Sequence, residues 1–112
     1  MDVELNLITR DTRDPDALCL EIFGTATPRT EEKFNISEEV SVQFQEKRAY
    51  DYGPTVVGLI ASIPTGVLTN LVTDAIKDAF RRKDPQGRIK RVEITYMEDG
   101  RVRKKSLEFE HS

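Results

Sequence analysis

The middle of the chain holds a run of 22 residues, 52–73, that contains no charged side chain. Charged residues make up 33% of the 112-residue sequence. A run of this length and of average composition would therefore carry about seven of them. Because apolar side chains are driven out of water, this run has to be covered by something. It is therefore a core helix, an interface or a membrane-seeking segment.

The spacing of small residues in the run favours a helix. Gly58, Ser62, Gly66 and Asn70 recur at every fourth position, which places them in one stripe of a helix. Such a stripe lets a helix pack closely on a sheet or on a second copy, and Pro64 would kink the helix or start the next one. We predict a helix over 54–80 whose uncharged part binds a partner. The predicted interaction surface consists of Val57, Gly58, Leu59, Ile60, Ser62, Ile63, Gly66 and Asn70.

A membrane-seeking segment is the alternative interpretation of the same run. Small-residue stripes bring helices together in bilayers, and the cations at 81–83 are typical of a cytoplasmic flank. Asp74 and Asp78 interrupt the continuation, and the Thr and Asn content weakens insertion. We therefore expect at most a reversible or partner-induced contact with an anionic membrane surface.

Alternation of apolar and polar residues predicts strands in the first half of the chain. Residues 3–7 and 18–22 each show this alternation, and the simplest interpretation pairs them as a hairpin. Residues 34–44 are predicted to form one long strand, or two strands interrupted near 37–39.

The period changes to that of a helix from Val67 onward. An ion pair between Asp78 and Arg82 is expected on its polar side, and Asp84-Pro85 ends it. The apolar stripe consists of Val67, Leu68, Leu71, Val72, Ala75, Ile76, Ala79 and Phe80.

Residues 88–110 predict a hairpin. Asp99-Gly100 favours a type I′ turn, in which both central residues have positive φ. In that register Val92 faces Leu107, Met97 faces Val102, and Tyr96 faces Arg103. We expect the tip of this hairpin to be basic and exposed.

These patterns together predict one α+β domain over residues 1–112. Its sheet is expected to be largely antiparallel with about five strands, and one long helix, kinked within the uncharged run, covers one face. The predicted order of elements is β-β-β-α-β-β.

Charge is distributed unevenly along the chain, although the net charge is only −3. Residues 1–51 hold 12 acidic and 6 basic side chains, whereas residues 77–105 hold 11 basic and 5 acidic ones. Either the basic part meets an acidic or polyanionic partner, or the two halves compensate each other in the fold. The predicted basic patch consists of Arg81, Arg82, Lys83, Arg101, Arg103, Lys104 and Lys105.

The residues that most enzymes use are scarce in this sequence. The only histidine, His111, is next to last, and the only cysteine, Cys19, is expected to be a buried, inert thiol. Gly53 and Gly58 have the spacing of a phosphate loop, but Leu59 stands where that loop needs lysine. We therefore expect no catalytic residue, no cofactor and no metal site. The first residues lack the features of a signal peptide, so a cytoplasmic location is expected.

One combination of segments resembles a known family. The uncharged segment that runs into VLTNLVTDAIKDAFRRK, followed by the hairpin VEITYMEDGRVRKKSLEF, resembles the effector-associated constant component proteins of bacterial conflict and defence systems. The similarity covers about residues 55–110. It implies an adaptor role beside an effector protein, in antiviral defence, and it carries over no catalytic residue.

The leading hypothesis is therefore a small non-catalytic adaptor, bacterial in origin. It would bind a protein partner or a second copy of itself, at the inner face of a membrane in one version. The alternative is binding of nucleic-acid phosphates through the basic C-terminal hairpin.

Overall fold

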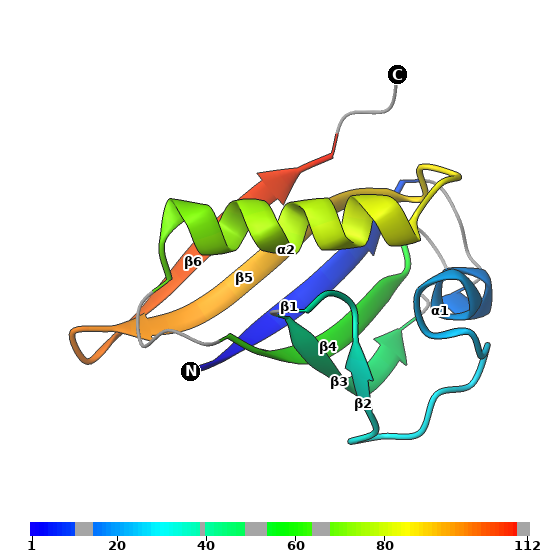
Figure 1. The fold of residues 1–112 in the computed structure, drawn as a ribbon, viewed down its shortest axis with the longest axis horizontal. Coiled ribbons are helices and arrows are strands. Elements are labelled where there is room, and N and C mark those ends of the chain that lie inside the picture. Colours follow the sequence, from blue (N-terminus) through cyan, green and yellow to red (C-terminus); the bar gives the residue numbers. More distant parts are fainter. Residues whose placement is uncertain (11–14, 39, 49–53, 64–67, 110–112) are drawn as a thin grey trace.

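The structure is a computed structural model that describes residues 1–10, 15–38, 40–48, 54–63 and 68–109 (Figure 1). Within these residues six strands form one sheet in the order β2-β3-β4-β1-β5-β6, and every neighbouring pair is antiparallel. The elements are β1 Asp2–Thr9, α1 Pro15–Phe23, β2 Lys33–Asn35, β3 Ser41–Arg48, β4 Val56–Ser62, α2 Asn70–Lys83, β5 Ile89–Glu98 and β6 Arg101–Glu108.

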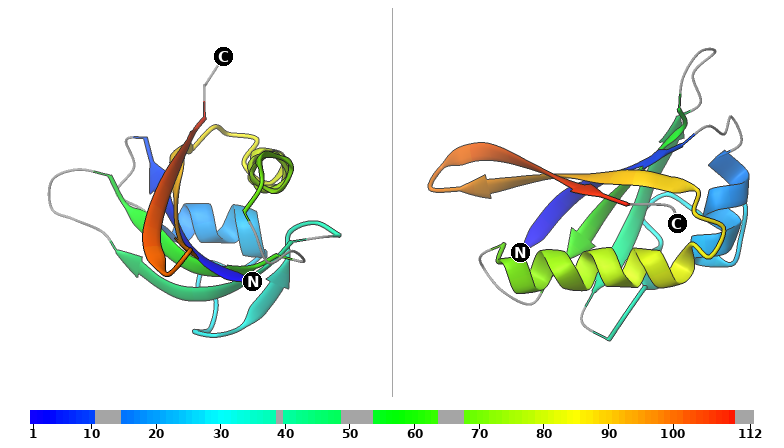
Figure 2. Two further views of the ribbon diagram at one scale, coloured as in Figure 1. Left: turned by 90° about the vertical axis from the view of Figure 1, so that its left-hand side faces the viewer. Right: turned by 90° about the horizontal axis from the view of Figure 1, so that it is seen from above.

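Both helices lie on the same, concave side of a strongly twisted sheet (Figure 2). Helix α2 runs along this side beside β5 and β6, while α1 lies near the end of the sheet where α2 ends (Figure 1). No described helix covers the opposite side, which we call the uncovered face. Among the described residues the fold is therefore a two-layer α+β arrangement, with both helices in one layer and the sheet in the other.

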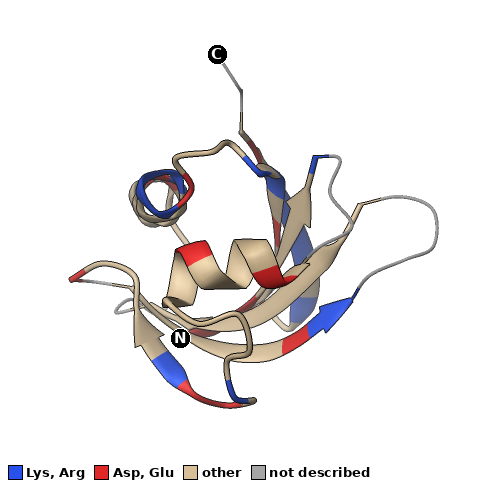
Figure 3. Ribbon diagram, turned by 90° about the vertical axis from the view of Figure 1, so that its right-hand side faces the viewer, with Lys and Arg blue, Asp and Glu red and all other residues tan. Residues whose placement is uncertain are grey.

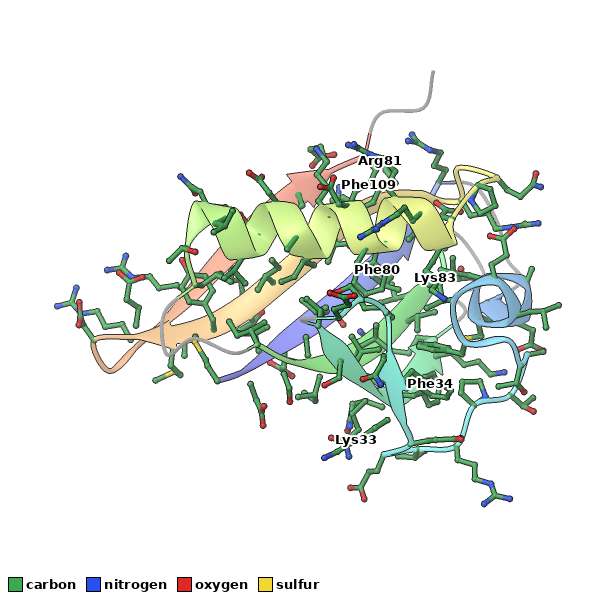
Figure 4. The ribbon with its side chains drawn as sticks, in the orientation of Figure 1. Lys33, Phe34, Phe80, Arg81, Lys83 and Phe109 are labelled. Carbon is green, nitrogen blue, oxygen red and sulfur yellow. The ribbon has the colours of Figure 1, made fainter. Side chains whose placement is uncertain are left out.

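The core forms between the helices and the sheet. Val3, Leu5 and Leu7 of β1 alternate with exposed or half-buried polar residues, which is the pattern of a strand with one covered face. From α2, Phe80 points toward the sheet and is fully buried (Figure 4). At the other end Phe23 of α1 stacks at 4.5 Å from Phe34 of β2, measured between ring centroids.

The predicted helix over 54–80 is wrong in its first half. Residues 56–62 form β4, hydrogen-bonded between β1 and β3, and the helix begins only at Asn70. The predicted kink at Pro64 lies outside the described residues. A central strand with few solvent contacts has no need for charge, so it produces the same uncharged run as a buried helix.

The predicted strand over 18–22 is also wrong, because these residues lie in α1. Leu18, Cys19 and Ile22 are buried, whereas Leu20 is 55% exposed. Positions i, i+1 and i+4 share one face of a helix, whereas a strand would have placed Leu18 and Leu20 on the same face. Three apolar residues at alternate positions are too few to distinguish the two-residue period of a strand from the 3.6-residue period of a helix.

The broader predictions are confirmed in part. The fold is α+β with an antiparallel sheet, but it has six strands and two helices among the described residues, in the order β-α-β-β-β-α-β-β. The segment from 34 to 44 belongs to two strands, β2 and β3, and not to one long strand, which confirms the second of the two predicted alternatives.

In α2, Leu71 was expected in the apolar stripe but is 80% exposed. The expected pair of Asp78 with Arg82 is replaced by Arg81, at 3.8 Å from the Asp78 carboxylate.

The C-terminal hairpin is confirmed in detail. Asp99 and Gly100 both have positive φ, 51° and 74°. Val92 pairs with Leu107, and the pairs nearer the turn also follow the predicted register. The tip, residues 98–103, is exposed as expected.

Candidate interaction surface

The interaction surface predicted from the uncharged run is not a surface in the structure. Val57 and Leu59 of β4 are buried against the helices, and Ile63, just after β4, is buried as well. Ile60 and Ser62 belong to the opposite, uncovered face, where Ile60 is half-buried and Ser62 is exposed. Asn70 is the exposed first residue of α2, and Gly66 lies outside the described residues. The eight predicted residues therefore do not form one contact area, because strand alternation distributes them over two faces.

Gly58 is small for a reason that the helical stripe did not anticipate. It lies in β4 on the uncovered face, where the side chain of Glu46 crosses over it from β3. A Cβ atom at this position would lie 3.2 Å from Cγ of Glu46 and 3.6 Å from Oδ1 of Asn6. Close approach of a neighbouring side chain explains this glycine within the monomer.

The membrane alternative concerned the same run. Among the described residues, no helix has the length and apolar character that a bilayer crossing requires.

The predicted basic patch is divided into two groups. Arg81, Arg82 and Lys83 end α2, whereas Arg101, Arg103, Lys104 and Lys105 lie on β6. The hairpin turn and the C-terminal end of α2 lie at opposite ends of the molecule (Figure 1). Figure 3 looks at the end of α2 and shows its cations apart from those on the strands. The two groups therefore cannot act as one compact site.

The β6 group lies on an edge strand. Strand β6 pairs with β5 only, so its other edge is free of the described chain. Arg101, Val102, Arg103 and Lys104 are all exposed. We call residues 89–108, which form β5 and β6, the hairpin arm.

The cations of β6 have no ionic partner among the described residues. None of the four forms an ion pair with a described carboxylate, although Nζ of Lys105 donates a hydrogen bond to Oδ1 of Asn70 at 3.1 Å. Some cations elsewhere in the chain do have an ionic partner, as in Arg88 with Glu21 at 3.3 Å and Arg91 with Glu93 at 3.1 Å. Mutual compensation of the basic and acidic halves therefore holds for Arg88 but not for β6.

Strand alternation directs these cations to two sides. The bond from Lys105 to α2 places it on the helix side of the sheet, and Arg101 and Arg103 share this side because they are two and four residues away. Lys104 and Val102 point to the uncovered face. From α2, Nζ of Lys77 lies 5.8 Å from the centre of the ring of Phe109, the residue after β6. A row of positive charge therefore follows the helix side of the arm.

Sequence analysis did not include one apolar feature of the uncovered face. Met97 and Val102 pair across the arm and are 56% and 63% exposed, which is unusual for large apolar side chains in so polar a chain. With Ile60 and Glu4 they line a shallow recess of about 240 Å³. The predicted register already paired Met97 with Val102, but only the tertiary structure shows that no described segment covers them.

The residues considered for chemistry lie apart from this surface. Cys19 is fully buried in the core, as expected for an inert thiol. His111 lies outside the described residues. No three His, Cys, Asp or Glu side chains come together as possible metal ligands in the part of the chain that the structure describes.

Comparisons with protein families, with curated proteins and with solved structures find no match to this chain.

Proposed function

We propose that this chain is a non-catalytic binding module that engages an acidic surface of a partner protein through the hairpin arm. The observation that supports this proposal is the free edge of β6 with its four cations, none of them paired with a described carboxylate. Uncompensated charge on an exposed strand raises the rate of encounter with a partner of opposite charge and restricts which partners bind.

The adaptor role in bacterial defence remains part of the proposal. It rests on the resemblance to effector-associated constant component proteins, which now concerns α2 and the hairpin arm, since residues 56–62 form a strand. In this view the acidic partner is an effector protein that the chain recruits or triggers.

Nucleic acid is the second candidate, since the same arginine and lysine side chains suit phosphate groups. Two observations favour a protein instead. The whole chain has a net charge of −3, whereas nucleic-acid-binding domains are usually basic overall. Tyr96, the aromatic residue of the arm that could stack on a base, is half-buried and packed against the core.

The experiment compares three anionic probes at 150 mM salt: poly-L-glutamate, a 20-nucleotide single strand and vesicles containing phosphatidylglycerol. The proteins are the wild type, Arg103→Glu/Lys104→Glu on the arm, and Arg29→Glu/Lys33→Glu as a matched control. Both double variants change the charge by the same amount, and Arg29 and Lys33 are exposed near the opposite sheet edge.

We expect the wild type and the control to bind poly-L-glutamate more tightly than the other two probes, and the arm variant to lose that binding. Tighter binding of the single strand, with affinity that falls steeply with salt, would assign the arm to nucleic acid. Preference for the vesicles would assign it to a membrane surface. Equal losses in both variants would mean that the arm has no special role.

A further inference from the structure

We infer that the partner contributes an acidic, extended segment that pairs with the free edge of β6 and extends the sheet by one strand. This inference rests on the proposed function and specifies how the arm binds. Strand addition to a free sheet edge is a common mode of peptide recognition, in which backbone hydrogen bonds supply affinity and side chains supply specificity.

The hydrogen-bond pattern between β5 and β6 identifies which backbone groups of β6 are available to bond to an added strand. The amide of Phe109 donates to the carbonyl of Lys90 at 2.9 Å, in the same register as the β5–β6 pairing. In an antiparallel pair, alternate residues bond to the neighbouring strand. Counting back from Phe109, the odd-numbered residues of β6 bond to β5. The backbone groups that point outward therefore belong to Val102, Lys104, Ser106 and Glu108.

The side chains beside that edge specify the composition of the segment. Arg101, Arg103 and Lys105 lie on the helix side, so acidic residues at alternate positions of an added strand would face them. On the uncovered face the added strand would lie beside Val102, near the tip, and beside the alkyl chain of Lys104. A segment in which acidic and β-branched residues alternate would place its acidic residues beside the cations on the helix side and its β-branched residues on the uncovered face.

The opposite edge of the sheet does not offer this site. Strand β2 has only three residues, Lys33–Asn35, against the eight of β6. Glu31 and Glu32 directly precede it and are exposed, so an acidic segment would be repelled there. The sheet therefore has one edge that is long enough and of the right charge.

A second copy of the chain is not the occupant that the charges favour. Antiparallel pairing of two β6 strands through their outward backbone groups places Lys104 opposite Lys104 and Arg103 opposite Lys105, or, shifted by one residue on each strand, Lys105 opposite Lys105. Like charges directly across a strand pair are destabilising, and edge lysines commonly keep copies of a protein from pairing in this way. The same cations attract an acidic strand.

The test uses fluorescent peptides with four repeats of Glu-Val at micromolar concentration. One peptide is unmodified, one carries N-methyl groups on every valine, and one carries them on every glutamate. In a bound strand of either direction only one of the two alternating sets of amides faces β6. We expect one N-methylated peptide to bind at least about tenfold more weakly while the other binds like the unmodified peptide, because each lost backbone hydrogen bond costs about 1 kcal/mol.

A matched pair of variants tests the same contact from the protein. Lys104→Pro removes an outward amide but no bond to β5, and Lys104→Thr removes the same charge with the amide intact. We expect Lys104→Pro to bind the unmodified peptide about tenfold more weakly than Lys104→Thr. Circular dichroism checks that both variants fold.

The outcomes separate this inference from the proposed function. Binding that depends on Arg103 and Lys104 but is equal for all three peptides would overturn strand addition and leave an acidic partner in place. Equal losses with both N-methylated peptides would also overturn it. Failure of every acidic probe, poly-L-glutamate included, would overturn the proposed function itself.

Discussion

Leu59→Ala separates the two interpretations of the uncharged run. In the structure Leu59 is 1% exposed on the covered side of β4, between Leu5 of β1 and Phe44 of β3. As part of a partner-binding helix surface, the same residue would be exposed in the free chain. The substitution therefore costs stability in one case and affinity in the other.

The size of the effect follows from the burial. Leu→Ala removes three carbon groups at about 0.8 kcal/mol each, and the remaining cavity raises the total to about 3 kcal/mol. Dividing this loss of about 3 kcal/mol by the unfolding entropy expected for a domain of this length gives a fall in Tm of roughly 13 °C. Ile60→Ala is the control, because Ile60 is the next residue, half-buried on the uncovered face, and should cost about 1 kcal/mol.

The measurement is urea unfolding followed by circular dichroism, with both variants analysed at the wild-type m-value. We expect the midpoint to fall much further for Leu59→Ala than for Ile60→Ala. If Leu59→Ala changes stability by less than about 1 kcal/mol, its side chain is not enclosed and the placement of β4 in the core is refuted.

Substitutions at three further positions test a buried hydrogen-bonded carboxylate, a helix cap and a turn, each by the same unfolding measurement. The buried carboxylate of Asp84 accepts two backbone N–H bonds at 2.9 and 2.8 Å, so Asp84→Ala should cost about 3 kcal/mol. A loss below 1 kcal/mol would contradict this role. Thr69 caps α2 by accepting from the amide of Val72 at 3.2 Å, so Thr69→Ala should cost about 1 kcal/mol, whereas Thr69→Ser should be nearly neutral. Gly100→Ala should cost about 1 kcal/mol because φ is +74°, although no atom obstructs its Cβ; an unchanged midpoint would show that the turn is not type I′.

The register of the hairpin arm could be predicted because its determinants are local. A two-residue Asp-Gly turn sets the register of both strands, and alternation then assigns the faces. The position at which α2 ends could also be predicted from local residues, because Asp84-Pro85 does not continue a helix. No information from distant parts of the chain was needed.

The central strand could not be recognised from its own residues. Residues 56–62 are apolar at nearly every position, and whether such a run is strand or helix depends on its neighbours. Here β1 and β3 bond to both edges of β4, and only the assembled sheet provides them. The spacing of Gly58 and Ser62 suggested a helical stripe, although Gly58 is small because Glu46 lies over it.

The candidate site was predicted in its chemistry but not in its location. The cations of β6 were identified, yet their separation from those at the end of α2 depends on the direction in which α2 crosses the sheet. The exposure of Met97 and Val102 likewise depends on the two helices lying on the same side. These are relations between elements far apart in the chain, which local spacing does not encode.

The amino-acid sequence alone determined the α+β class, the arm with its register, and the surplus of positive charge near the C-terminus, because turn chemistry and side-chain alternation act over a few residues. The tertiary structure decided that the uncharged run is a core strand and that β6 is a free edge. Burial and strand order arise from contacts between distant segments, so these two properties exist only once the sheet has formed.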